Sequence, residues 1–139
     1  MTLVVDASAV VVALLDEGPD GEWARSAMER EAITAPGHLH VEVSSALRRA
    51  VLSGLIGRDV AAMAHEEVVA LRLTTFPFEP LAARVWALHP NVTAYDAAYV
   101  ALAEELDVPL LTLDRRLTRA EGPTCSFLLP PEEAESMPG

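Results

Sequence analysis

The sequence predicts a single α/β domain with a central, mostly parallel sheet of four to five strands. Short apolar runs that fit buried strands alternate along the chain with longer segments of helical periodicity, and the first run is residues 2–5. Such alternation is typical of parallel strands whose connecting helices cover both faces of the sheet. The chain has 139 residues, of which 51% are hydrophobic. One domain of this length buries roughly two-thirds of the surface of its unfolded chain.

The first part of the chain contains two of the predicted strands. Residues 2–5 form the first strand, and the apolar stretch 8–15 fits either a buried helix or a buried strand. Asp-Glu-Gly-Pro at 16–19 ends this stretch. We expect an exposed helix over 21–32 and a short strand over 33–35, which a Pro-Gly pair closes.

The rest of the chain continues the alternation. Apolar residues recur at helical spacing over 38–52, which predicts a helix there. Further helices are expected over 58–73, 80–89, 93–106 and 115–120, and further strands over 75–78, 110–113 and 124–129. In the helix over 58–73, four apolar side chains are expected to face the core: Val60, Met63, Val68 and Leu71.

We assign residues 1–129 to one folded domain and residues 130–139 to a tail. The tail, Pro-Pro-Glu-Glu-Ala-Glu-Ser-Met-Pro-Gly, is acidic and has no apolar periodicity. A segment of this composition cannot bury enough apolar surface to offset the entropy lost on ordering, so we expect it to be disordered.

The sequence is that expected of a cytoplasmic protein without membrane contact. No apolar stretch approaches the roughly 20 residues that a membrane span requires. The N-terminus leads directly into a strand, without the basic and apolar regions of a signal peptide. The chain has one cysteine, Cys125, which has no partner for an internal disulfide and is expected to be a buried, inert thiol.

The charge of the chain limits its functions. The formal net charge is −11, which argues against broad, non-specific binding to nucleic acid. Omitting the three tail glutamates reduces this to −8, and neutralising four acids in a metal site reduces it to −4. All ten basic residues are arginine, so Schiff-base chemistry, a lysine general base and Walker-type phosphate binding are excluded.

Four acidic residues occupy positions that a parallel sheet brings together. Asp6 and Asp114 each end an apolar run, and Glu42 and Asp96 each lie in the first turns of a predicted helix. Open α/β folds bind their ligands at the carboxyl ends of the strands. Because hard divalent cations prefer oxygen ligands, the pattern predicts a Mg²⁺ or Mn²⁺ site at that edge.

Each acid also has a structural interpretation. Asp6 and Asp114 fit N-caps of the helices that follow their strands. Thr93 and Asp96 have the spacing of a capping box, and Glu42 carries a favourable charge near a helix N-terminus. Caps do not require carboxylates, however, and four carboxylates in one place repel each other unless a cation is bound.

The segments that carry the four acids also resemble a known family. They are Val4-Val5-Asp6-Ala7-Ser8, His40-Val41-Glu42-Val43, Tyr95-Asp96-Ala97-Ala98-Tyr99-Val100-Ala101-Leu102-Ala103 and Leu111-Thr112-Leu113-Asp114-Arg115-Arg116-Leu117. In order, spacing and total length they resemble the PIN-domain ribonucleases, and within them the VapC-type toxins of type II toxin–antitoxin systems. The resemblance covers nearly the whole chain and implies a PIN-like three-layer α/β/α fold.

This resemblance implies a function and partners. The chain is expected to be a Mg²⁺-dependent endoribonuclease, with Mn²⁺ as a substitute, that cuts a structured cellular RNA and inhibits translation. A cognate antitoxin would insert a basic side chain into the acidic pocket, and family members commonly form homodimers that assemble with it. The implied metal-binding and catalytic set is Asp6, Glu42, Asp96 and Asp114, with Ser8 and Thr112 as polar neighbours.

Several other side chains have two interpretations. Arg115, Arg116 and Arg119 either steer phosphate into the site or form a solvated helix face. Arg49, seven residues after Glu42, lies either at the edge of the site or on the surface.

A zinc site is a further alternative. His38 and Glu42 share a helix face, whereas His40 points elsewhere, so a surface histidine at the helix entry is the default interpretation. Tyr95 and Tyr99, one turn apart, border either a substrate groove or the core.

Three other functions remain to be compared. An aspartyl phosphatase requires a second Asp two residues after Asp6, where this chain has Ser8, and a downstream lysine, which is absent. An inactive interaction module is disfavoured because all four acids are present. A nuclease of RNA processing that acts without an antitoxin stays open.

Overall fold

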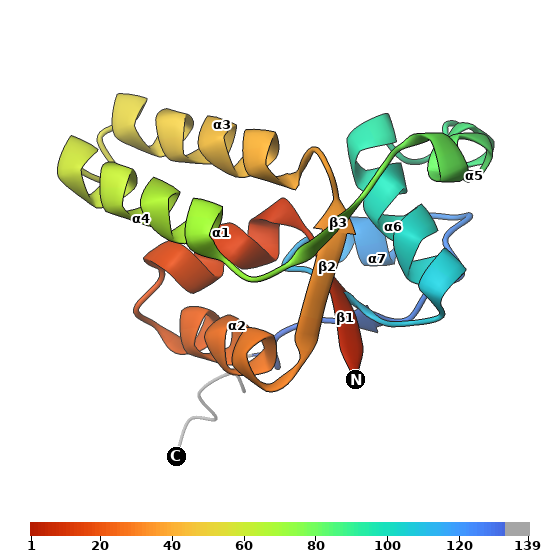
Figure 1. Cartoon of the computed structure of the whole chain (residues 1–139), viewed down its shortest axis with the longest axis horizontal. Coiled ribbons are helices and arrows are strands. Elements are labelled where there is room, and N and C mark those ends of the chain that lie inside the picture. The colour runs from red at the N-terminus through yellow and green to blue at the C-terminus, as the bar shows by residue number, and fades with distance from the viewer. Residues whose placement is uncertain (133–139) are drawn as a thin grey trace, which may run out of the picture.

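The structure, a computed structural model, describes residues 1–132 and has a five-stranded sheet between two layers of helices (Figure 1). The strands are β1 (Thr2–Val5), β2 (Ala32–Pro36), β3 (Thr74–Phe76), β4 (Leu110–Leu111) and β5 (Phe127–Leu128). The helices are α1 (Ala7–Leu15), α2 (Pro19–Arg30), α3 (Leu39–Leu52), α4 (Arg58–Ala70), the 3₁₀ helix η1 (Glu79–Leu81), α5 (Ala82–Ala87), α6 (Ala94–Leu106) and α7 (Arg115–Thr118).

The sheet has the order β3-β2-β1-β4-β5, and all four neighbouring pairs are parallel. Helices α1 to α4 lie on one side of it, and α5 and α6 lie on the other (Figure 1). The predicted α/β class, with a mostly parallel sheet of four to five strands in three layers, is therefore confirmed.

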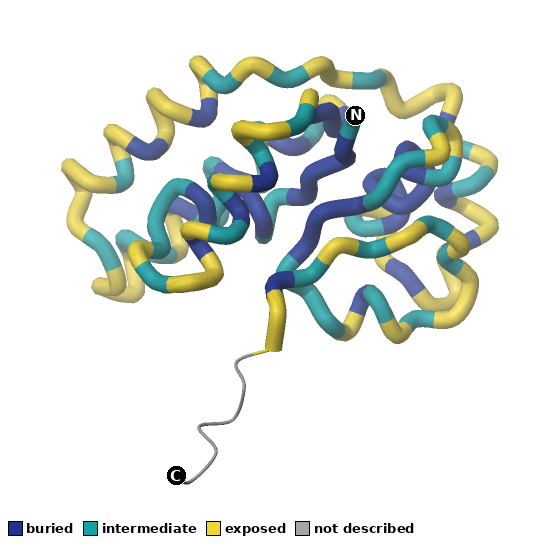
Figure 2. The backbone as a smooth tube through the Cα atoms, turned by 90° about the horizontal axis from the view of Figure 1, so that it is seen from below, coloured by how far each residue is buried: buried dark blue, intermediate teal, exposed yellow. Residues whose placement is uncertain are grey.

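The core lies around β1 and α6. In β1, Leu3, Val4 and Val5 are buried, because this strand has a neighbour on each side and helices on both faces. Helix α6 is buried continuously from Ala97 to Ala103 and packs against β1, β2 and β4. Figure 2 shows the buried residues gathered in these central segments, with exposed residues around the periphery.

The direction of the strands determines where the polar residues meet. Asp6 directly follows β1, Gly37 and His38 lead from β2 into α3, and Thr112 directly follows β4. Because β2, β1 and β4 are adjacent and parallel, these strand ends lie at the same edge of the sheet.

Some boundaries and one helix face differ from the sequence-based expectation. The ambiguous stretch 8–15 is helical, as α1. The strand expected over 110–113 ends at Leu111, because the Thr112 side chain turns to the neighbouring strand end. In α4, Val68 is buried, but Val60 and Met63 are 50% and 63% exposed, because the contacts of α4 with α3 and α1 leave these two side chains outside the interface.

The structure describes the first part of the predicted C-terminal tail. Pro130, the first residue assigned to the tail, is buried, and its carbonyl accepts a hydrogen bond from Arg115 at 2.9 Å. Residues 133–139 of the predicted tail lie outside the described residues. Among the helices of residues 1–132, none has the length and apolar character that crossing a membrane requires.

Gly21→Ala is expected to destabilise the protein, although alanine is ordinarily about 1 kcal/mol better than glycine in a helix. A Cβ atom at this position would stand 1.9 Å from the carbonyl oxygen of Asp16, where α2 begins close to the end of α1. The two helices must move apart, which costs typically 1–3 kcal/mol. Urea denaturation should therefore show a lower unfolding midpoint.

Gly57→Ala is the matched control, because a Cβ atom there meets nothing within 4 Å. The Gly57 backbone has a φ of −78°, which alanine adopts freely. A midpoint that falls equally in both variants, or rises in Gly21→Ala, would contradict the steric explanation.

Candidate functional site

The structure brings the four predicted acids to one cleft. Asp6, Glu42, Asp96 and Asp114 line a hollow of about 380 Å³, and Arg49 lines it with them. Asp6 and Asp114 precede the first residues of α1 and α7, and Glu42 and Asp96 lie in the first turns of α3 and α6. Residues distant in the sequence thus form a single acidic cleft.

Asp6 has the lowest exposure of the four, with 4% of its surface accessible. As the N-cap of α1, its Oδ1 accepts hydrogen bonds from the Ala9 backbone N–H at 3.0 Å and the Ser8 hydroxyl at 2.6 Å. Its Oδ2 accepts from the Thr112 hydroxyl. Both carboxylate oxygens are therefore fixed, and the capping and clustering interpretations hold for the same side chain.

Ser8 and Thr112, expected as polar neighbours of the site, connect the ends of β1 and β4. The Ser8 hydroxyl accepts from the Leu113 backbone N–H at 3.0 Å, and the Thr112 hydroxyl accepts from the Asp114 backbone N–H at 3.0 Å. Each hydroxyl thus donates to Asp6 and accepts from the segment after β4. This arrangement holds the backbone of Asp114 beside Asp6.

The surroundings of Asp6 disfavour its negative charge. Burial raises the pKa of Asp6 to about 6, and repulsion from Asp96 adds to the increase. The hydrogen bonds from Ser8, Thr112 and Ala9 lower the pKa because they stabilise the ionised carboxylate, but burial outweighs them. A positive charge in the cleft would favour the ionised form.

Glu42 is held by two side chains from different elements. Its Oε1 accepts from the Tyr99 hydroxyl of α6 at 2.8 Å and from His38 Nε2, at the start of α3, at 2.9 Å. Burial alone raises the pKa of Glu42, but the bonds from His38 and Tyr99 outweigh it, and the pKa is lowered. Glu42 is therefore ionised at neutral pH.

Tyr99 and His38 were not among the predicted site residues, although the sequence contained a signal for each. Tyr99 is 1% exposed and lies in the core, as the simpler interpretation has it. A buried tyrosine hydroxyl requires a hydrogen-bond partner, however, and that partner is Glu42. His38 stands one helical turn before Glu42, which places both on one face.

Asp96 and Asp114 face each other across the cleft. The pKa of Asp96 is raised, first by burial and then by the negative charges of Asp114 and Glu42. The backbone N–H of Asp96 donates to the Thr93 hydroxyl at 3.2 Å, so Thr93 is the N-cap of α6. Asp114 Oδ1 accepts from the backbone N–H groups of Arg116 and Leu117 and caps α7.

The candidate RNA-binding arginines differ in their placement. Arg49 lines the cleft and helps to lower the pKa of Glu42. Arg115 turns away from it, toward the Pro130 carbonyl and Glu132, whose carboxylate lies 3.7 Å from Nη1. Arg116 is 93% exposed, and its Nε lies 3.8 Å from Asp114 Oδ1. Arg49 thus lines the cleft with the acids and Arg116 lies beside Asp114, whereas the Arg115 guanidinium is held at the Pro130 carbonyl.

The chemistry of the cleft fits a hard divalent cation, with a condition. Four carboxylates supply oxygen ligands, and the raised pKa values of Asp6 and Asp96 reflect a negative field that a cation would relieve. In residues 1–132, however, no three His, Cys, Asp or Glu side chains stand close enough to hold a metal ion in their present rotamers. Binding therefore requires carboxylate rotation or bridging waters, several of which Mg²⁺ retains.

Comparisons with known proteins agree with this architecture. A family model described as PIN domain matches residues 3–123. The ribonuclease VapC1 of Mycobacterium tuberculosis is 46% identical over 127 residues, which cover 91% of this chain and 96% of that protein.

Two solved structures are similar in fold. VapBC2 from Rickettsia felis, bound to a promoter DNA fragment, has a TM-score of 0.66 at 11% identity and covers 93% of this chain and 98% of its own. VapC20 from Mycobacterium tuberculosis, a sarcin–ricin loop cleaving toxin, has a TM-score of 0.65 at 13% identity and covers 84% and 93%. At these identities the similarity establishes the fold alone.

In metal-free buffer, Asp6→Asn should gain stability relative to the unchanged protein as the pH rises from about 4 to about 7. Folding raises the pKa of Asp6 from 3.8 to about 6. Protonated Asp6 therefore stabilises the folded protein fully at a pH below 3.8, and this stabilisation is lost as the pH rises through about 6. The difference corresponds to on the order of 3 kcal/mol. Urea unfolding of both proteins across this range measures it.

The difference in the free energy of unfolding between the two proteins removes the contributions of other titrating groups, such as Glu42, because both proteins contain them. Asparagine keeps the oxygen that accepts from Ala9 and carries no charge to desolvate. A difference that stays constant from pH 4 to pH 7 would contradict the raised pKa of Asp6.

Proposed function

This chain belongs to the PIN-domain family and, within it, to the VapC ribonucleases, and from this membership we propose that it is a metal-dependent endoribonuclease toxin. The observation that carries the proposal is the cleft in which four carboxylates meet although their charges repel each other. A protein gains nothing structural from this repulsion, since serine, threonine or asparagine would cap α1 and α7 equally well. A bound cation would offset the repulsion, and this explains why all four positions are carboxylates.

The proposed cation is Mg²⁺, with Mn²⁺ as a substitute. Asp6, Asp96 and Asp114 would hold it, in part through water, and Glu42 would stand at its edge. When bound, such an ion stabilises charge on a phosphate and promotes deprotonation of water. The raised pKa values of Asp6 and Asp96 support this assignment, because both carboxylates become more favourable in their ionised form next to a cation.

Glu42 orients the attacking water and accepts its proton. Within residues 1–132, both hydrogen bonds to this carboxylate end on Oε1, so Oε2 remains to accept from water. His38 and Tyr99 keep Glu42 ionised, so this carboxylate accepts the proton of the water itself and no other base is required. In-line attack of the water on phosphorus breaks the bond to the 3′ oxygen, which takes up a proton from solvent, and leaves a 5′-phosphate and a 3′-hydroxyl.

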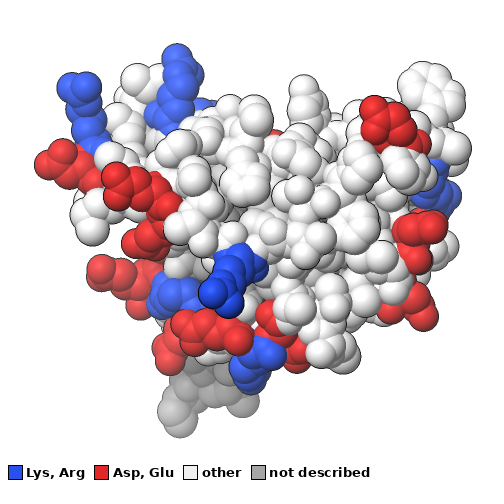
Figure 3. All heavy atoms as spheres, viewed as in Figure 1, with Lys and Arg blue, Asp and Glu red and all other residues white. Residues whose placement is uncertain are grey.

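Arg49 and Arg116 provide positive charge at the margins of the cleft. On the face that Figure 3 displays, basic side chains stand in separate places, with acidic side chains among them, and form no broad basic surface. Contact with RNA therefore depends on local arginines rather than on a broad basic surface.

We further propose that the RNA is a structured cellular RNA, that cutting it inhibits translation in the cytoplasm, and that a cognate antitoxin blocks the cleft. The sarcin–ricin loop activity of VapC20 and the pairing of VapC with VapB in VapBC2 support these points. An acidic cleft is best blocked by a basic side chain of the antitoxin. We expect a homodimer that assembles with this partner.

The metal site predicts measurable Mn²⁺ binding by calorimetry. Asp6→Asn and Asp96→Asn should each weaken the affinity by about 10-fold or more, since even residues that only orient metal ligands cost 10–100-fold. Affinity in the unchanged protein should increase as pH rises through about 6, where Asp6 ionises. Asp59→Asn, which removes an exposed acid from α4, is the control and should bind as the unchanged protein does.

The nuclease activity predicts discrete cuts in total cellular RNA incubated with the purified, antitoxin-free protein in Mg²⁺ or Mn²⁺. EDTA, Asp6→Asn and Asp96→Asn should each abolish the cuts, with rates reduced on the order of 100-fold or more. Asp59→Asn should cut normally. Sequencing the new ends identifies the RNA and tests for the 5′-phosphate.

Two results would count against the proposal. Cleavage that survives EDTA or both substitutions would indicate a contaminant or another chemistry. A folded protein that leaves several RNA pools intact would favour an interaction module, and cutting without any growth effect would favour a role in RNA processing.

A further inference from the structure

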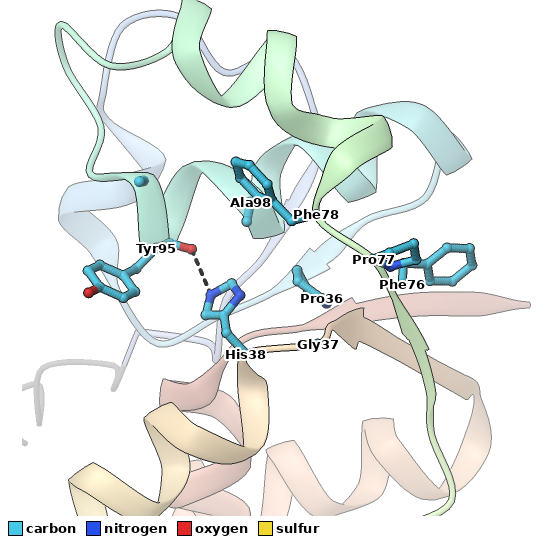
Figure 4. Close-up of a pocket in the computed structure, with 9 residues that line it drawn as sticks. Pro36, Gly37, His38, Phe76, Pro77, Phe78, Tyr95 and Ala98 are labelled. Atoms are coloured by element: carbon cyan, nitrogen blue, oxygen red, sulfur yellow. Dashed lines mark hydrogen bonds between the residues drawn. The ribbon is translucent and has the colours of Figure 1, made fainter.

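A second hollow of about 410 Å³ lies beside the acidic cleft, at the ends of β2 and β3. Its walls include Pro36, His38, Phe76, Phe78, Tyr95 and Ala98, and we call it the aromatic pocket. Figure 4 shows His38 and Tyr95 toward one end of this set and Pro77 and Phe76 toward the other, with Pro36 and Ala98 between them. The residues come from β2, β3, α6 and the connections after the two strands.

The aromatic pocket leaves large rings open to solvent. Phe78 is 54% exposed and Tyr95 is 65% exposed, although both border a hollow that neither ring fills. The residues lining it carry no formally charged side chain apart from a protonatable histidine. The pocket therefore suits a flat, apolar group rather than a phosphate.

The aromatic pocket and the acidic cleft share a wall. His38 Nε2 lies 2.9 Å from Glu42 Oε1 and 3.2 Å from the Tyr95 carbonyl oxygen. Tyr95 lines the pocket and the next residue, Asp96, lines the cleft. One strand of nucleic acid can therefore present a phosphate to the acids and an adjoining group to the pocket.

The hydrogen bonds of His38 also define the polar chemistry of this wall. Both partners of Nε2 are acceptors, so Nε2 carries a hydrogen, and Nδ1 has no hydrogen-bond partner among residues 1–132. In Figure 4 this second nitrogen lies on the side of the ring away from Tyr95. A group that stacks on an aromatic ring and also offers a polar edge would meet both features of the pocket.

We propose that the aromatic pocket binds one unpaired nucleobase of the RNA strand that is cut, next to the phosphate held at the four acids. The inference rests on the function proposed above. It adds a feature of the substrate, an unpaired base, that the four acids do not contact. Nucleobases have a flat face for Phe78 or Tyr95 and a polar edge for His38 Nδ1. Stacking of this kind is the usual means by which proteins hold single-stranded RNA.

The pocket also explains how a carboxylate cluster gains substrate discrimination. The acids contact a phosphodiester, which is the same at every position of an RNA chain. A base that must leave its helical stack to enter the pocket restricts cutting to loops, bulges and ends. Structure in the RNA would thus be recognised through the base that it leaves unpaired.

The test uses heptaribonucleotides that carry the fluorescent base 2-aminopurine at one position at a time, titrated with the full chain in Mg²⁺. Gel electrophoresis checks that each probe stays intact during the reading. We expect strong quenching at one position, and Phe78→Ala should abolish it and weaken binding by roughly 5- to 150-fold. A probe with an abasic residue at that position should bind the unchanged protein more weakly, by the same factor. The Phe78→Ala variant should bind this abasic probe no more weakly than it binds the complete one.

Trp86→Ala is the matched control, because this exposed aromatic residue of α5 stacks on His89, outside the pocket. It should keep both the affinity and the quenching. Phe78 is half exposed, and circular dichroism and the unfolding midpoint establish that its variant is folded.

Equal quenching at all positions, or unchanged binding by Phe78→Ala, would overturn the proposal and leave the pocket to a side chain of a partner protein. If that same preparation still cuts RNA, the nuclease function stands and only the base site fails. If it neither binds nor cuts any RNA, the proposed function fails first, and the base site fails with it.

Discussion

The rest of the site depends on the buried carboxylate of Asp6. Its two oxygens accept hydrogen bonds from the Ser8 hydroxyl and the Ala9 backbone N–H, which follow β1, and from the Thr112 hydroxyl, which follows β4. Because the same hydroxyls hold the segment after β4, the position of Asp114 follows from that of Asp6. The fold thus maintains a charge that its own interior disfavours, and stability is lost so that a rigid acidic site is kept.

Helix α6 connects this site to the core and to the aromatic pocket. Within five residues it presents Tyr95 to the pocket, Asp96 to the cleft and Tyr99 to Glu42, and the residues from Ala97 to Ala103 are all buried. A helix buried on nearly all sides has little freedom to rotate. The spacing between the acids and the pocket is therefore set by the core, which makes a fixed distance between phosphate and base a property of the scaffold.

Much of the fold was predictable, because strand ends, breakers and helical stripes are local patterns. The positions of Asp6 and Asp114 followed from apolar runs that end in carboxylates, and the structure places both acids in one cleft. The exposure of Val60 and Met63 was not predictable, since it depends on which helices α4 meets. The direction of Arg115 toward Pro130, and the bonds from Tyr99 and His38 to Glu42, likewise depend on contacts between distant segments.

The Ser8–Asp6–Thr112 arrangement also has an evolutionary consequence. Replacing Asp6 by asparagine would remove a buried charge and keep the backbone cap, so under the proposed function an inactive protein would still fold. Under the proposed function, a single nucleotide change at this codon would silence the gene product and leave it folded. Descendants of this kind would keep their partner-binding surfaces, and would be able to titrate an inhibitor away from active copies.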